Sequence, residues 1–237
     1  MRNTLAIAKK ELNSYFVSPV AYVVTAAFLV LCGLLFSLSL NFYREASMRS
    51  IFYNMPIILV LLSPALTMRL LAEESRSGTI ELLLTAPVRD WEVVLGKFLG
   101  ALGLLLTMLA LTLLYVVFLL AYGNPDRGPL LSGYLGIILL GGVTLSIGVL
   151  TSSLTQNQIV AAILAFVGLL VLWLSGGVGN FFGGSALGSI FSYLDLTQHY
   201  NDFANGLIDS SNVLYYLSLI VACLFLASKS LETRRWS

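Results

Sequence analysis

Long uncharged runs, separated by short charged segments, dominate the pattern of this chain. With their immediate flanks, these runs predict six membrane-spanning helices. A helix needs about 20 apolar residues to cross the hydrocarbon core of a bilayer. The longest run, Gly128–Leu194, has 67 residues without a charge and is too long for one span, so we divide it at the polar turn Thr151–Gln158. The expected spans are about 19–40, 51–72, 94–122, 131–151, 158–175 and 211–230.

Residues 1–18 have a two-sided pattern. One face of a helical wheel is apolar and the other is polar, which predicts an amphipathic helix lying in the membrane interface. The alternative is a helix that covers a soluble core, but the six spans leave no such core in the chain. The apolar face holds Leu5, Ala8, Leu12, Tyr15 and Phe16, and the polar face holds Arg2, Lys10, Asn13 and Ser14.

The segment 176–210, before the last span, is rich in glycine and aromatic residues. It is too apolar for a free loop, and its glycines are expected to end the fifth span near residue 175. Irregular backbone at membrane depth must be covered by protein, so we expect a re-entrant hairpin or interfacial helices on the outer side. The predicted fold class is therefore an all-α integral membrane protein.

Composition supports a membrane location. The 237 residues are 58% apolar and 11% charged, whereas soluble domains carry roughly 25% charged residues. The net charge of +1 argues against nucleic acid as a partner. Cys32 and Cys223 both lie in apolar runs, which suggests neither a disulfide framework nor a metal cluster.

The basic residues predict the topology. Ten of thirteen fall on one side of the predicted spans if both termini are cytoplasmic, and cytoplasmic segments carry the excess of Lys and Arg. We expect a multi-pass protein of the cytoplasmic (inner) membrane without a cleavable signal peptide. The three outer basic residues are Arg44, Arg49 and Arg127.

The charged stretch Glu73–Lys97 lies between two long apolar runs and would be cytoplasmic. Ser77–Thr79 can start a helix, Ile80–Ala86 can form about two turns, and Pro87 would stop it. An exposed leucine-rich helix suits a groove on a partner protein, although it would also suit the membrane surface. The expected docking residues, at about 78–86 and the following proline, are Gly78, Thr79, Ile80, Glu81, Leu82, Leu83, Leu84 and Pro87.

The charges around this segment form a second set of site residues. Glu73 and Glu74 are expected to cap a helix or to pair with Arg69 and Arg76 at helical spacing; a catalytic pair of carboxylates is the alternative. We expect Lys97 to extend from the start of the third span toward the interface. Gly96 and Gly100 match the small-xxx-small pattern of helix packing.

On the outer side, Asp195, His199 and Asp202 form D-x-x-x-H-x-x-D. Such a set would bind a metal weakly, whereas a zinc site has three or four ligands that include Cys or further His. A polar outer-face loop is the favoured interpretation.

Two absences narrow the function. The chain has no G-x-x-x-x-G-K-[ST] phosphate loop, since Gly96-Lys97 is followed by Phe98, so we expect neither an ATPase nor a cofactor in this chain. No charge lies between Arg127 and Asp195, which leaves no proton relay or ion-binding carboxylate within that part of the bilayer.

The order of an acidic residue, a G-T-x-E-x-L-L run, a proline and a G-K pair resembles the cytoplasmic signature of ABC-2 type permeases. The segment HYNDFANGLID before the last span is similar to the subgroup of the gliding-motility permease GldF. The residues that carry the first resemblance are Glu73, Glu74, Arg76, Gly78, Thr79, Glu81, Leu82, Leu83, Pro87, Val88 and Val94–Lys97.

This resemblance implies a six-helix permease that pairs with a second copy or a paralogue. Two copies of a separate ABC-type ATP-binding subunit, which hold ATP and magnesium, would dock on the coupling helix. The charges at 69, 73, 74, 76 and 97 would transmit motion. Membrane lipid and possibly a further extracytoplasmic component are the other expected partners.

The expected function is therefore ATP-driven export. A membrane scaffold or mechanotransmitting anchor for a soluble ATPase complex is the alternative, and an intramembrane enzyme is a third. The uncharged bundle would suit a lipid, a lipid-linked glycan or a hydrophobic peptide as cargo.

Overall fold

The computed structural model describes residues 2–43, 47–79, 88–123, 125–181 and 185–235, and the regular elements in these ranges are all helices. The prediction of an all-α protein is confirmed. The elements are α1 (Arg2–Val17), α2 (Pro19–Leu38), the π-helix η1 (Ser39–Tyr43), α3 (Arg49–Thr67), α4 (Ala72–Ser77), α6 (Asp90–Tyr122), α7 (Arg127–Leu154), α8 (Gln158–Phe181), α9 (Ala186–Leu194), α10 (Leu196–Ala204) and α11 (Ser210–Arg235).

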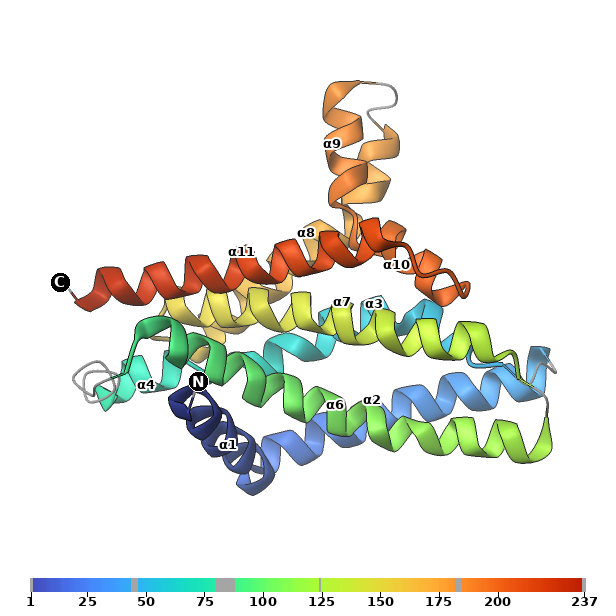
Figure 1. Cartoon of the computed structure of the whole chain (residues 1–237), viewed down its shortest axis with the longest axis horizontal. Coiled ribbons are helices and arrows are strands. Elements are labelled where there is room, and N and C mark those ends of the chain that lie inside the picture. Colours follow the sequence, from blue (N-terminus) through green and yellow to red (C-terminus); the bar gives the residue numbers. More distant parts are fainter. Residues whose placement is uncertain (1, 44–46, 80–87, 124, 182–184, 236–237) are drawn as a thin grey trace.

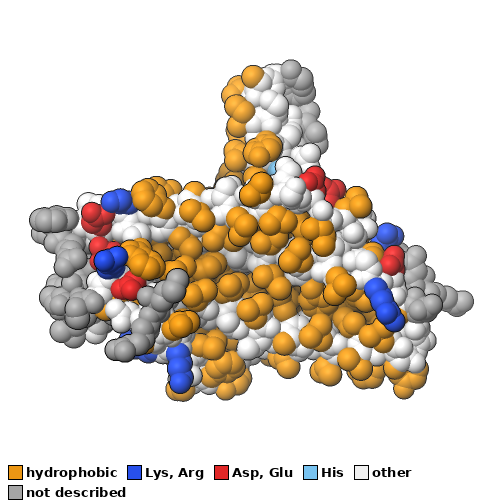
Figure 2. Space-filling model, in the orientation of Figure 1, with side chains coloured by type: hydrophobic (Ala, Val, Ile, Leu, Met, Phe, Trp, Pro, Cys, Tyr) orange, Lys and Arg blue, Asp and Glu red, His pale blue; other side chains and the backbone are white. Residues whose placement is uncertain are grey.

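Six of these helical segments are long and apolar enough to cross a membrane, which confirms the predicted count. They run along one common direction as a bundle, and both termini and α4 lie at the same end, which we call the terminal end (Figure 1). Figure 2 shows apolar side chains over the middle of the bundle and charged side chains toward its two ends. That distribution fits a helix bundle surrounded by lipid, with its ends in water.

Helix α7 is the centre of the bundle. It contacts α3, α6, α8, α10 and α11, and 72% of its most apolar stretch is buried, against 22% for the corresponding stretches of α2, α8 and α11. Glycines let its neighbours approach closely: a Cβ on Gly136 would lie 2.6 Å from the Cβ of Phe203. Small residues at helix contacts are typical of membrane bundles, because close packing there supplies much of the attraction between helices.

A turn between α3 and α4, which we call the corner, interrupts the helix of the second span. Residues 68–71 form a turn, and a buried serine of α7 satisfies its backbone. The Ser152 hydroxyl accepts hydrogen bonds from the amides of Leu71 and Ala72, both at 3.0 Å, and donates to the carbonyl of Met68 at 3.2 Å. One side chain of another span therefore holds this corner.

The segment before the last span is helical, and one expectation for it was wrong. Helix α8 does not end near residue 175 but continues to Phe181. Gly179 lies on a contact face: a Cβ there would lie 2.9 Å from both the Gly188 carbonyl oxygen and the Ser192 amide nitrogen of α9. The end of α8 and α9 thus form a hairpin that stands off the bundle (Figure 1), and α10 packs on α3 and α7.

The Ser152 contact predicts a stability effect. Replacing Ser152 with Ala leaves two buried backbone amides without an acceptor, which costs about 1–3 kcal/mol. We expect a lower free energy of unfolding for Ser152→Ala in mixed detergent micelles. The control is Ser189→Ala, which removes an exposed serine hydroxyl bonded within its own helix; equal stability of the two variants would contradict the assigned role of Ser152.

Candidate functional site

The start of α6 orients the side chains of the charged stretch. The Glu92 carboxylate accepts a hydrogen bond from the amide of Arg89 at 3.1 Å, next to the first residue of α6, and one from the side chain of Asn3 at 3.4 Å. Acidic residues in a first turn also interact favourably with the helix dipole. This capping ties the beginning of α6 to α1.

Two glycines of α6 bring α1 close to this start. A Cβ on Gly96 would lie 2.7 Å from the side chain of Ile7, and a Cβ on Gly100 would lie 2.6 Å from the Cβ of Glu11. The small-xxx-small pattern at these positions is therefore a helix-packing face, and its partner is α1. Without side chains at these positions, the two backbones approach closely, and Lys97 lies at their contact.

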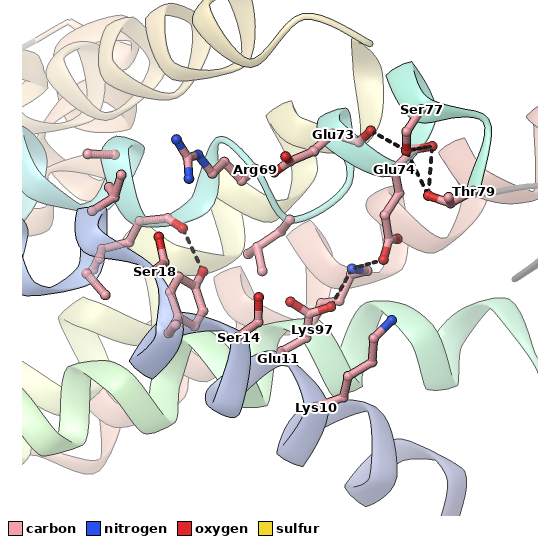
Figure 3. A pocket seen from close by; sticks show the side chains of 16 residues that line it. Lys10, Glu11, Ser14, Ser18, Arg69, Glu73, Glu74, Ser77, Thr79 and Lys97 are labelled. Atoms are coloured by element: carbon pink, nitrogen blue, oxygen red, sulfur yellow. Dashed lines mark hydrogen bonds and ion pairs between the residues drawn. The ribbon is translucent and has the colours of Figure 1, made fainter.

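The Lys97 ammonium lies between two carboxylates from different helices (Figure 3). Its Nζ is 2.7 Å from Glu11 Oε1 of α1 and 2.9 Å from Glu74 Oε1 of α4. Lys97 is only 1% exposed, and a buried charge is tolerated only when it is paired. We call Glu11, Glu74 and Lys97 the charge cluster; it joins α1, α4 and α6 at the terminal end.

These contacts correct two expectations from the sequence. Lys97 does not extend to a water interface but is buried, and Glu74 pairs with it instead of with Arg69 or Arg76. The spacing rule from Arg69 fails because residues 68–71 form a turn, so residue 69 does not lie on the helix that carries Glu74. Arg76 lines a separate hollow with the Thr155–Asn157 turn.

Glu11 was missed from the sequence. The available signal was a lone acidic residue in a helix that otherwise carries Arg2, Lys9 and Lys10. One turn further along α1, the Tyr15 hydroxyl donates to the carbonyl of Leu66 at 2.6 Å. Burial, and to a smaller extent the Glu11 carboxylate, raise the pKa of the Tyr15 phenol, so it remains a hydrogen-bond donor.

The expected coupling helix is described only at its start. Gly78 ends α4 in the left-handed conformation, with φ 71°, which glycine adopts without a steric penalty. The Ser77 and Thr79 hydroxyls lie 2.8 Å apart. The remaining docking residues, Ile80, Glu81, Leu82, Leu83, Leu84 and Pro87, lie outside the described residues, and their role stays a prediction.

The outer candidates lie on one face of α10, and each has a partner within the fold. Asp195 caps α10 by accepting from the amide of Thr197 at 2.8 Å, and Asp202 accepts from the side chain of Asn212 at 2.7 Å. The His199 ring stacks on Tyr215 with a centroid distance of 3.9 Å. The Asp202 and His199 contacts fasten α10 to α11. Across the described part of the chain, no three His, Cys, Asp or Glu side chains converge as a metal site would require.

Six apolar helices with charges toward the ends of the bundle define a polytopic membrane protein. Within that class, the chain belongs to a known family: the model of the ABC-2 family transporter proteins matches residues 5–234. The match covers the six membrane-spanning helices, the charge cluster and the region before the last helix. It does not distinguish the GldF-like subgroup, which stays a prediction.

Two curated relatives from Escherichia coli K12 are similar over part of the chain. The probable multidrug ABC transporter permease YbhR is 32% identical over 108 residues, which is 45% of this chain and 29% of that protein. The probable multidrug ABC transporter permease YbhS is 38% identical over 111 residues, which is 45% of this chain and 28% of that protein. The matched region thus spans less than a third of the length of either relative.

Removing the cation of the charge cluster should destabilise the protein. Lys97→Met leaves two carboxylates facing each other, at side-chain exposures of 14% and 18%. Because both are partly screened by water, we expect a loss of about 2–3 kcal/mol in the free energy of unfolding, below the usual range for a fully buried pair. Lys97→Met/Glu11→Gln/Glu74→Gln should recover part of this loss; no recovery would mean that the effect of Lys97 is not electrostatic.

The glycine face of α6 gives a matched pair of helix variants. Gly100→Ala should destabilise the protein by about 1–3 kcal/mol, since overpacking against Glu11 forces the two helices apart. Gly177→Ala meets nothing within 4 Å and should be neutral or stabilising by up to about 1 kcal/mol, because alanine favours a helix. Unfolding in mixed micelles measures both, and a stabilised Gly100→Ala protein would refute the packing face.

Proposed function

We propose that the chain is the permease subunit of an ABC exporter, driven by separate ATP-binding subunits that hold ATP and magnesium. Two such subunits dock at the terminal end, which lies on the cytoplasmic side of the inner membrane. A second permease copy or a paralogue completes the membrane part, and the cargo crosses between the two copies. Membership of the ABC-2 family supports this assignment, as do the names of the two relatives.

One observation supports the coupling step above all: the charge cluster borders the proposed docking segment on both sides. Glu74 precedes residues 78–87 on α4, and Lys97 follows them on α6. A push on that segment therefore acts on both sides of the same ion pair. Through α4 it reaches the second span, and through α6 it reaches the third.

Helix α1 joins the same unit through Glu11. Leu5 and Phe16 are exposed, as expected of a helix that lies in the membrane interface, whereas Leu12 of the same predicted apolar face packs on α6 at Gly103. In this proposal α1, α4 and the start of α6 move together, and Arg69, Glu73 and Arg76 lie around them as exposed charges.

A membrane scaffold, which anchors an ATPase complex without moving cargo, is the second candidate. It uses the same docking residues but needs no mechanical link to the spans. The buried ion pair between α4 and α6 favours the permease, because a static anchor gains nothing from linking the docking segment to two spans.

Leu83→Glu tests the docking role. A charge on an apolar contact should reduce recovery of the ATP-binding subunit by about tenfold or more. The measurement is affinity purification of the tagged chain from native membranes, with identification of co-purified proteins and an ATPase assay. Thr233→Glu, which adds the same charge at the same end of the bundle, is the control and should retain the partner.

Three results would separate the candidates. Loss of the partner with Leu83→Glu alone supports docking at residues 78–87. A retained partner that hydrolyses ATP at the same rate with the Lys97→Met chain as with the wild-type chain would favour the scaffold. Purification of a full-length chain with no phosphate-loop protein would refute both assignments.

A further inference from the structure

A cavity of about 340 Å³ lies beside the charge cluster, between α1, the α3–α4 corner and the start of α2 (Figure 3). One part of its wall is apolar and another part is charged. Small apolar side chains such as Ala21 and Ala65 come from the ends of two spans, and charged side chains come from α1 and the corner. Ligand sites commonly measure about 300–1,000 Å³, so this cavity suits a small polar group with an apolar extension.

The charges of the wall balance. Lys10, Arg69 and Lys97 face Glu11, Glu73 and Glu74. In Figure 3, Lys10 and Glu11 extend from α1, and Glu74 descends from α4 toward Lys97, while the Arg69 side chain extends to the opposite side of the view from Lys10. A purely anionic or a purely cationic ligand would therefore meet as many repelling side chains as attracting ones. A ligand that carries both charges fits this wall better.

Part of this charge is not engaged within the protein. Lys97 is held by Glu11 and Glu74, whereas Lys10, Arg69 and Glu73 have no ion pair among the described residues. The second carboxylate oxygen of Glu74, Oε2, is buried and accepts no hydrogen bond from any part of the chain that the structure describes. A buried acceptor without a donor is costly, so this oxygen marks the position for a donor group of a ligand.

We propose that the cavity binds a phospholipid headgroup that carries both a phosphate and a primary ammonium, as in phosphatidylethanolamine. The phosphate pairs with Arg69, because a guanidinium matches phosphate geometry with two parallel hydrogen bonds. The ammonium donates to Glu73 and to Oε2 of Glu74. The glycerol and acyl chains follow the apolar wall toward the spans.

Two features select this headgroup over other lipids. A quaternary ammonium has no N–H and cannot satisfy the buried oxygen of Glu74. An anionic headgroup without a cation supplies no charged donor to Glu73 or to Oε2 of Glu74. Through Glu74 the lipid becomes a fourth member of the charge cluster. This proposed binding does not rest on the proposed transport function.

Native mass spectrometry of the delipidated full-length protein in detergent tests the proposal. Dioleoyl phosphatidylethanolamine should bind at least about fivefold more tightly than the phosphatidylcholine or phosphatidylglycerol with the same chains. Arg69→Gln and Glu73→Gln should each remove most of this preference. The matched controls Arg127→Gln and Glu232→Gln make the same charge changes at other surface positions and should keep it.

Ser14→Trp is a second variant that does not alter charge. Ser14 lines the cavity from an exposed position on α1, so a tryptophan there should block the site without disturbing the fold. Equal binding of the three lipids, or unchanged preference in Arg69→Gln, Glu73→Gln and Ser14→Trp, would overturn the proposal. Soluble O-phosphoethanolamine that displaces the lipid at equal concentration would also overturn it, since the acyl chains would then contribute nothing.

Discussion

A single ammonium group, that of Lys97, sets the arrangement of the terminal end. In a low-dielectric position this charge is stable only while both Glu11 and Glu74 accompany it. Each carboxylate comes from a different helix, so the ion pairs specify where α1 and α4 lie against α6. Any movement that separates these helices must expose or neutralise the charge, which makes the three helices behave as one body.

That arrangement depends on close backbone contacts elsewhere in the bundle. Glycines on α6 let α1 approach near Lys97, and glycines on α7 let neighbouring spans pack around the centre. In lipid the hydrophobic effect gives helices little reason to associate, so such contacts and interhelical hydrogen bonds supply the attraction. The same feature of the sequence thus serves both the membrane core and the charged end.

The membrane part of the fold follows from local sequence, whereas the site does not. Uncharged runs suffice for the spans, because length and hydropathy determine whether a helix crosses lipid. One of the two partners of Lys97, Glu11, is 86 positions away on α1, and no local pattern connects them. The pairing expected for Arg69 relied on continuous helical spacing, and the turn at residues 68–71 removes that spacing. Glycines after residue 175 suggested a break, but Gly179 is a packing position against α9 within the helix α8.

The Ser152 hydroxyl has a consequence for local unfolding. Amides at a junction between two helices ordinarily exchange their hydrogens quickly, because they lack partners within a helix. Those of Leu71 and Ala72 instead donate to a side chain of the most buried span. Their exchange requires α7 to part from the corner, so these two amides report, from within the second span, on the opening of the bundle's centre.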